Sequence, residues 1–471
     1  MDLMTIMYPE VLLSLVVLSL VLYGINLSTF KVSIGVLLII GIVIGFQSYY
    51  IVEDHIICWT NGLLMTNSWI IISKAIIVIG STSLLLMGSS PEGEWNKISS
   101  YKGGSSPILI LIVALSSLLL VSSVNWLSIY LAIELQTLIL FILAALRRDS
   151  AYSTEAGLKY FVLGAVSSGL FLFGCALLYG LTGETSIQGI NSVLIADVGK
   201  ILITISLLFK LSAAPFHMWA PDVYEGAPTT TTALLATIPK VGVFSILVQI
   251  GPVTNVVLVC GVLSIVYGAI GALNQTKIKR LLAYSGIGHM GFTLFGIAVG
   301  SFESVQASLI YIIIYIIMTI CSFSIILSLK LTKDLIIEVS GLSRDNPVIA
   351  LTLALTFLSI AGIPPLAGFL SKWLILLAGV SSGYYLICGI VVVSSVIAGV
   401  YYVRLVQIIY FPFGRADYSL LIWQKVLRKE KRINLSKSLL IGFTFFIILF
   451  LMISPNFLLQ ITHDAAISLY M

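Results

Sequence analysis

Charged side chains inside apolar stretches are the residues of this chain best suited to do chemistry. One acid and three lysines lie within such stretches: Glu134, Lys210, Lys240 and Lys372. A charge at membrane depth costs about 2.5–3.5 kcal/mol on insertion scales, so it usually marks a function. Lysine can release a proton when it is taken out of water, whereas arginine stays charged. The pattern therefore favours a proton relay in which a lysine balances the buried acid.

Four further side chains are candidate members of this relay. Tyr130 precedes Glu134 by four residues and so shares its helix face. Lys159 lies in another apolar stretch. His217 and His289 fit a relay or a hydrogen-bonded core position equally well, and neither has a second ligand at metal spacing.

Two other bases lie inside predicted spans but close to their ends. We expect the long side chains of Lys74 and Arg404 to extend to the membrane surface.

Two prolines, Pro215 and Pro364, interrupt apolar stretches that also carry Lys210 and Lys372. Proline breaks a helix, and a membrane tolerates the break only where the freed backbone groups line a cavity or pack on protein. Interrupted spans with polar groups are how transporters build ion sites near the bilayer midplane. We therefore predict ion translocation at these breaks; the alternative is a kinked span whose Lys210 extends to the surface.

The composition is that of an integral membrane protein. Of 471 residues, 59% are hydrophobic and 10% are charged, against about 25% charged in soluble domains. The five cysteines stand singly, and the chain has no CxxC pair, dinucleotide fingerprint or Walker loop. We therefore expect no metal, redox cofactor, nucleotide or nucleic acid to bind this chain.

We predict an all-α polytopic membrane protein of about fourteen transmembrane helices, two of them interrupted. The predicted spans are 9–27, 32–51, 68–89, 107–124, 126–146, 156–181, 198–224 (interrupted), 228–250, 253–273, 279–300, 304–330, 348–374 (interrupted), 383–411 and 437–459. Of the 25 Lys and Arg residues, 18 lie in odd-numbered connections or at the span ends beside them, and only Lys200 lies beside an even-numbered one. By the positive-inside rule the odd connections face the cytoplasm or its equivalent, with both termini opposite.

Short sequence echoes indicate two inverted repeats of five helices. LSAAP at 211–215 is similar to LSIAGIP at 358–364, and Tyr130 corresponds to Tyr284. Five spans, an odd number, separate each pair, so the halves must be inverted; chance similarity between apolar helices is the alternative. We expect a three-helix segment at 1–106, repeats at 107–252 and 253–412, and a basic loop with a last helix at 413–471.

Several long motifs resemble those of the antiporter-like subunits of respiratory complex I. The most specific is KLSAAPFHMWAPDVYEGAP at 210–228. The others are IYLAIELQ at 129–136, TEAGLKY at 154–160, QTKIKRLLAYS at 275–285 with GHMG at 288–291, and AGIPPLAGFLSK at 361–372. Together these motifs extend from about residue 120 to residue 410.

The resemblance implies a fourteen-helix fold with inverted repeats and a proton channel built on a Glu–Lys pair and a central lysine axis; we expect Glu134 and Lys210 to form the pair. By motif, Glu134 matches the acid of the fifth helix, and the three lysines match those of the seventh, eighth and twelfth: Lys210, Lys240 and Lys372. Relay roles for Lys159 and His289 transfer less directly. The chain itself would hold no redox centre, with FMN, iron–sulfur clusters and ubiquinone elsewhere in the complex.

The same resemblance implies partners and a location. The partners would be lipid and other membrane-arm subunits, including other antiporter-like ones. The location would be the mitochondrial inner membrane, with basic loops on the matrix side and both termini on the intermembrane side; plastid and bacterial relatives are the alternatives. A sodium/proton antiporter subunit and a non-pumping scaffold are the competing functions.

Overall fold

The computed structural model describes the chain except for residues 1–7, 24–28, 51–56, 60–62, 89–105, 148, 188–196, 330, 332, 333, 412–433 and 471. The basic cluster at 425–432 therefore lies outside the described residues.

The long apolar runs form helices because every backbone polar group must be satisfied within a span. In chain order these are α1 (Tyr8–Tyr23), α2 (Thr29–Tyr50), α3 (Ser68–Gly88), α5 (Ser106–Ser122), α6 (Trp126–Ala144), α7 (Ala151–Thr182), α9 (Asp197–Lys210), α10 (Trp219–Gly226), α11 (Thr229–Ile250), α12 (Thr254–Ala272), α13 (Ile278–Val299), α14 (Phe302–Leu329), α16 (Pro347–Ala361), α17 (Ala367–Ser381), α18 (Tyr385–Tyr410), α20 (Leu435–Ile453) and α21 (Asn456–Tyr470).

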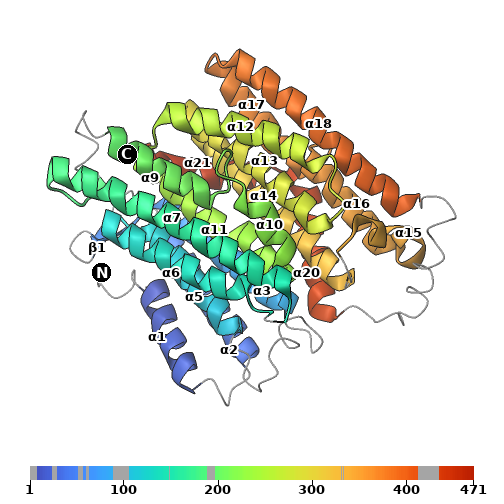
Figure 1. Cartoon of the computed structure of the whole chain (residues 1–471), viewed down its shortest axis with the longest axis horizontal. Coiled ribbons are helices and arrows are strands. Elements are labelled where there is room, and N and C mark those ends of the chain that lie inside the picture. Colours follow the sequence, from blue (N-terminus) through green and yellow to red (C-terminus); the bar gives the residue numbers. More distant parts are fainter. Residues whose placement is uncertain are drawn as a thin grey trace.

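The predicted fourteen-span architecture is confirmed. Ten of the described helices are long and apolar enough to cross a membrane, and four shorter apolar helices accompany them. Two spans are interrupted as predicted, one between α9 and α10 and the other between α16 and α17. The helices form one bundle that extends from α1 and α2 at one end to α17 and α18 at the other (Figure 1).

Four small elements lie in the connections that the structure describes. Strands β1 (Ile57–Trp59) and β2 (Leu64–Thr66) form an antiparallel hairpin between α2 and α3, with Ile57 opposite Thr66. A 3₁₀ turn (Ile336–Val339) and the short helix α15 (Leu342–Asp345) precede α16.

The predicted last span, 437–459, is wrong at its end. Helix α20 stops at Ile453, and a separate helix, α21, begins at Asn456. Pro455 explains the break, because proline lacks a backbone donor and disfavours helix in the residue before it. Helix α21 packs against α3 and α14, with Ser468 accepting a hydrogen bond from the Trp69 backbone at 3.1 Å.

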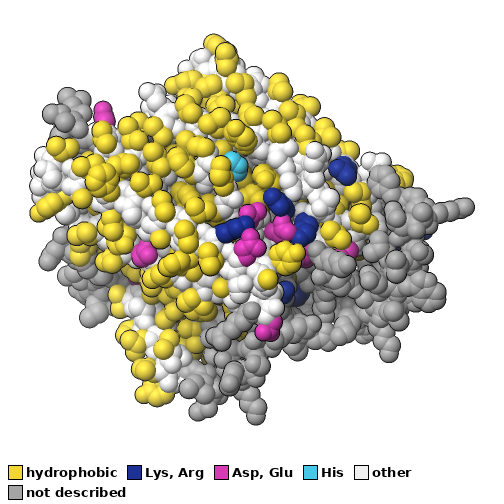
Figure 2. Space-filling view, viewed as in Figure 1, with side chains coloured by type: hydrophobic (Ala, Val, Ile, Leu, Met, Phe, Trp, Pro, Cys, Tyr) yellow, Lys and Arg dark blue, Asp and Glu magenta, His cyan; other side chains and the backbone are white. Residues whose placement is uncertain are grey.

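The outer surface matches a membrane environment. The face in Figure 2 is largely apolar, with one group of acidic and basic side chains near its middle, over α10. An apolar surface of this kind needs lipid or apolar protein against it.

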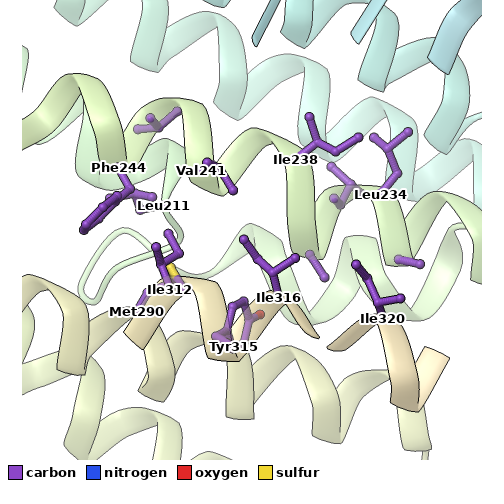
Figure 3. Packing of buried hydrophobic residues seen from close by; sticks show 14 of the residues in the cluster. Leu211, Leu234, Ile238, Val241, Phe244, Met290, Ile312, Tyr315, Ile316 and Ile320 are labelled. Atoms are coloured by element: carbon purple, nitrogen blue, oxygen red, sulfur yellow. The ribbon is translucent and has the colours of Figure 1, made fainter. Parts of the chain in front are cut away.

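The centre of the bundle is formed by α11 and α14, which are almost entirely buried. Leu234, Ile238 and Val241 of α11 face Ile316 and Ile320 of α14 across a tightly packed layer (Figure 3). A charged residue on either helix is therefore out of reach of lipid and headgroups.

Helices α12 and α13 approach each other through glycines. A Cβ at Gly268 would lie 2.6 Å from the Gly288 backbone nitrogen, and a Cβ at Gly291 would lie 2.2 Å from Ser264 Oγ. Such contacts leave no room for a side chain, so these glycines set the spacing of the two helices.

We expect Gly268→Ala to destabilise the protein by about 1–3 kcal/mol, because overpacking forces the two backbones apart. The check is the thermal unfolding midpoint of the solubilised protein. The matched control is Gly399→Ala on α18, where nothing lies within 4 Å of the new Cβ. Equal midpoints for the two variants would contradict this account of the interface.

Candidate functional site

Lys372 is held by the broken helix that precedes it. Helix α16 ends at Ala361, which frees its last carbonyls from helical bonding. The Lys372 ammonium donates hydrogen bonds to two of them, Ile360 O at 3.2 Å and Ala361 O at 2.6 Å. The side chain is 8% exposed. The predicted discontinuity is therefore present, and its freed carbonyls solvate the lysine directly.

Gly362 makes this contact possible. It has a φ of 88°, which favours glycine, and a Cβ there would lie 2.7 Å from Lys372 Cδ and 2.9 Å from its Nζ. Both the turn and the lysine pocket thus require the absence of a side chain.

Lys240 lies in the middle of α11, directly after Pro239, and is 2% exposed. Its ammonium donates a hydrogen bond to the Tyr315 hydroxyl at 3.2 Å. The ammonium also lies 5.3 Å from the centre of the Tyr315 ring and 6.0 Å from that of Tyr224. Aromatic faces attract a cation, so both tyrosines help to solvate this buried charge.

His289 lies between Lys240 and Lys372. Its Nδ1 shares a 2.7 Å hydrogen bond with the Tyr311 hydroxyl, and its ring is centred 5.4 Å from that of Tyr315. Phe292 stacks on Tyr311 with ring centres 5.5 Å apart, and the Lys372 ammonium lies 5.5 Å from the Phe292 ring centre. Polar and aromatic groups from α11, α13, α14 and α17 thus form one continuous buried series.

Glu134 and Lys210 do not form the predicted ion pair in this structure, since no contact within 4.0 Å joins them among the described salt bridges. Lys210 is the last residue of α9 and is 9% exposed. Neither its ammonium nor Glu134 Oε2 has a hydrogen-bond partner within the described chain. Glu134 is nonetheless close enough for its charge to act on Lys210.

The break after α9 is built from residues 211–218. Ser212 adopts a φ of 59°, in the left-handed region, and the Trp219 indole donates to Phe209 O at 3.1 Å. His217 lies in this segment, half-buried, with its ring centred 5.6 Å from that of Tyr267. Its Nδ1 has no partner among the described residues.

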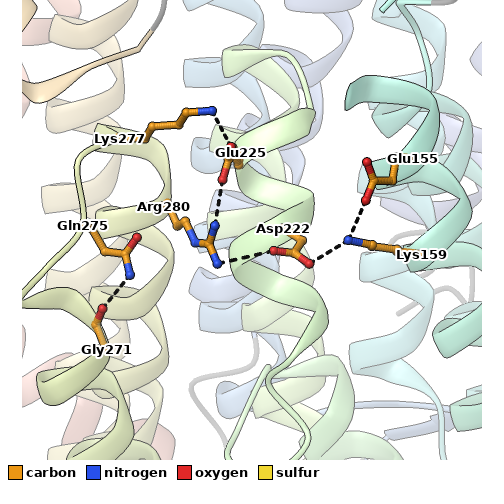
Figure 4. Close-up of polar contacts among 8 residues, drawn as sticks. All are labelled: Glu155, Lys159, Asp222, Glu225, Gly271, Gln275, Lys277 and Arg280. Atoms are coloured by element: carbon orange, nitrogen blue, oxygen red, sulfur yellow. Dashed lines mark hydrogen bonds and ion pairs between the residues drawn. The ribbon is translucent and has the colours of Figure 1, made fainter. Parts of the chain in front are cut away.

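Two other predicted relay members lie apart from the buried series. Tyr130 packs its ring against Phe171 at 6.3 Å. Lys159 is 39% exposed and pairs with Glu155 at 2.7 Å and Asp222 at 2.9 Å. Figure 4 shows that it joins Glu155 to a surface network in which Asp222 and Glu225 of α10 also bind Arg280 and Lys277 of the α13 end.

Sequence reasoning missed three tyrosines and misplaced one lysine. Tyr224, Tyr311 and Tyr315 contact the series, and the spacing of the last two, four residues apart on one face, was a usable signal. The prediction that Lys74 reaches the surface is wrong: it is 1% exposed and paired with Glu10 at 2.5 Å. Arg404 is exposed, in line with its predicted position.

No group of three or more His, Cys, Asp or Glu side chains that could hold a metal occurs in the described part of the chain. The expectation that no cofactor binds stays a prediction.

Comparison with known proteins identifies the class to which this fold and buried series belong. Residues 123–398 match the membrane family described as NADH:quinone oxidoreductase/Mrp antiporter. The chain is 64% identical over 381 residues to NADH-ubiquinone oxidoreductase chain 2 of Metridium senile, an alignment that covers 78% of this chain and 98% of that protein. The same protein of Marchantia polymorpha is 36% identical over 494 residues and 98% of both chains. The chain belongs to the NADH-ubiquinone oxidoreductase chain 2 family, as its motifs predicted.

A solved structure shares the fold. A chain of respiratory complex I from Thermus thermophilus, with bound aureothin, matches with a TM-score of 0.81 over 96% of this chain and 98% of that one, at 24% identity.

We expect Gly362→Ala to cost more stability than backbone strain alone. A left-handed residue with a Cβ costs about 1–2 kcal/mol, and here the new methyl group also displaces Lys372 from its carbonyls. Gly183→Ala is the matched control, because Gly183 has a φ of 73° with nothing within 4 Å. The measurement is the thermal unfolding midpoint of each variant. An equal decrease in the two midpoints would show that Lys372 moves aside without cost.

Proposed function

We propose that this chain is a proton-translocating, antiporter-like subunit of complex I, and that protons move along Lys210, Lys240, His289 and Lys372. The observation that carries the proposal is the buried series from Lys240 through Tyr315, His289 and Tyr311 towards Lys372. We call the three lysines the lysine axis. Each is at least nine-tenths buried, so none is an ordinary solvated surface charge.

The chemistry follows from how each lysine is solvated. Glu134 stabilises the charged form of Lys210 when the two approach, and separation weakens that stabilisation, which releases a proton towards Lys240. The Tyr315 hydroxyl can accept from Lys240 while donating onwards, and His289 can pass a proton between its two ring nitrogens. Lys372 receives the proton on an amine whose charged form is held by the carbonyls of α16.

The axis favours protons over sodium. The lysine side chains of the axis end in ammonium groups, which donate hydrogen bonds but have no lone pair with which to bind a metal cation. Alkali cations need oxygen ligands, and the freed carbonyls of Ile360 and Ala361 are already occupied by Lys372. This arrangement supports a proton carrier rather than a sodium/proton antiporter.

The energy must come from outside the chain. Moving one charge against the membrane potential costs about 2.3 kcal/mol per 100 mV. We propose that redox subunits carrying FMN, iron–sulfur clusters and ubiquinone supply it through conformational coupling, and that neighbouring membrane-arm subunits, antiporter-like ones included, transmit it. The location would be the inner mitochondrial membrane, with the odd-numbered connections in the matrix and both termini opposite.

We expect Lys240→Met in the assembled complex to abolish proton movement through this subunit, because a methionine of similar length cannot carry a proton. Protons moved per NADH oxidised, measured with reconstituted complex in liposomes, check this. Lys200→Met is the control, since Lys200 lies in the first turn of α9, away from the buried series. An unchanged ratio in assembled Lys240→Met enzyme would refute the proposed axis.

We expect Tyr315→Phe to slow coupled turnover by about tenfold. The change keeps the ring but removes a hydrogen bond of about 1–1.5 kcal/mol on the path, which corresponds to roughly that factor in rate. Tyr179→Phe on the exposed face of α7 is the matched control. Turnover that is equally fast in both variants would show that the Tyr315 hydroxyl is not a relay member.

A further inference from the structure

A buried ion pair lies in the N-terminal helices, outside the lysine axis. The Lys74 ammonium contacts Glu10 Oε1 at 2.5 Å, and the two residues are 1% and 7% exposed. Glu10 lies in the first turn of α1, and Lys74 is the seventh residue of α3. Lys74 thus lies about 9 Å along α3 from its start, short of the bilayer midplane at about 15 Å. Its side chain turns inward to Glu10 instead of reaching the nearby surface.

The pair borders a cavity of about 220 Å³. Ser14, Thr66 and Ser122 line it together with Glu10 and Lys74, and the remaining lining residues are apolar. Ser122 Oγ donates to Glu10 Oε1 at 3.4 Å. The Thr66 hydroxyl, in a residue 5% exposed, has no hydrogen-bond partner within the described chain. A water molecule needs only about 10–15 Å³ of such volume and two to four polar partners.

Stability alone does not account for this arrangement. A buried ion pair is costly to desolvate, and apolar residues of similar volume in its place often stabilise a protein equally well or better. A cavity beside it adds a further cost, because its walls lose packing contacts. Water in the cavity removes both difficulties, since it solvates the pair and satisfies Thr66.

The position of the site shows which side of the membrane it lies near. The first turn of α1, the start of α3 and the end of α5 lie on the side that the even-numbered connections face, here called the even side. Leu64 of the β1–β2 hairpin pairs with Ser123 at this end. The residue before Lys74 connects this region to α11, the helix of Lys240. Ser73 Oγ lies 3.2 Å from Ser245 Oγ, and Ser245 belongs to α11.

We propose that the Glu10–Lys74 pair and its cavity form a water-filled proton-exchange site open to the even side. The inference rests on the proposed function in that it adds a branch to proton translocation. The Lys74 ammonium gives a proton to the Glu10 carboxylate that it contacts, and Glu10 releases this proton to cavity water. A second proton from cavity water then adds to the Lys74 amine, so one proton leaves, one enters and both charges are restored. Glu10 and Lys74 are the only charged residues among the described ones that line the cavity.

Cysteine accessibility tests whether the cavity holds water. Ser122→Cys places a thiol on the cavity wall, and Ser117→Cys places one on the same helix, equally buried but away from the cavity. In membranes carrying the assembled complex, a charged, membrane-impermeant methanethiosulfonate applied to the even side should modify residue 122 at least about tenfold faster than residue 117. Peptide mass spectrometry distinguishes these thiols from the native cysteines. Equal, slow labelling of both positions would overturn the proposal.

Proton exchange is tested by Lys74→Met and Glu10→Gln, measured as protons moved per NADH oxidised. We expect both to lower the ratio, with Glu184→Gln, an exposed acid in an even-numbered connection, as control. If a single variant does not assemble, the double variant, which leaves no unpaired charge, decides. A wild-type ratio in assembled double variant would overturn the exchange role. If the Glu10 and Lys74 variants lower the ratio while Lys240→Met leaves it unchanged, the lysine axis is refuted but the exchange site is retained.

Discussion

The need to solvate ammonium groups inside a hydrocarbon layer governs this structure. Three deeply buried lysines are satisfied differently: Lys372 by backbone carbonyls, Lys240 by a tyrosine hydroxyl and two rings, and Lys74 by a carboxylate. A continuous helix has no free carbonyls to offer, so the interruption between α16 and α17 is what makes the Lys372 site possible. The glycine at 362 and the tyrosines on α14 follow from the same requirement.

The two repeats meet this requirement to different extents. In the second, Lys372 has two carbonyl partners, and His289 is fixed by Tyr311. In the first, the Lys210 ammonium and Glu134 Oε2 have no hydrogen-bond partner within the described residues. The chain thus combines a lysine that is bonded to backbone carbonyls with one whose ammonium no described protein atom hydrogen-bonds.

The spans and the axial charges could be predicted from sequence because both depend on local signals. Apolar run length, loop charge and proline position located fourteen spans and both breaks. The partner of Lys74 could not be predicted, because Glu10 lies 64 residues earlier and only packing brings α1 to α3. The Glu134–Lys210 distance likewise depends on the angle between helices α6, α7 and α9. Helix α21 was not predicted because it is short and contains polar residues, so it does not appear as an apolar run. It packs against other helices of the bundle.

Helix α21 has a mechanical consequence. It links the start of α3, through Ser468, to α14, where Gln306 donates to Leu459 O at 3.1 Å, and to the end of α13, where Tyr470 donates to Gly300 O at 3.1 Å. All three attachments lie at the even side and join the N-terminal helices to the second half of the chain. These three contacts restrain sliding between the N-terminal helices and the second half of the chain at that side. At the opposite side, α10 meets α7 and α13 through partly exposed ion pairs, which cost little to break and re-form.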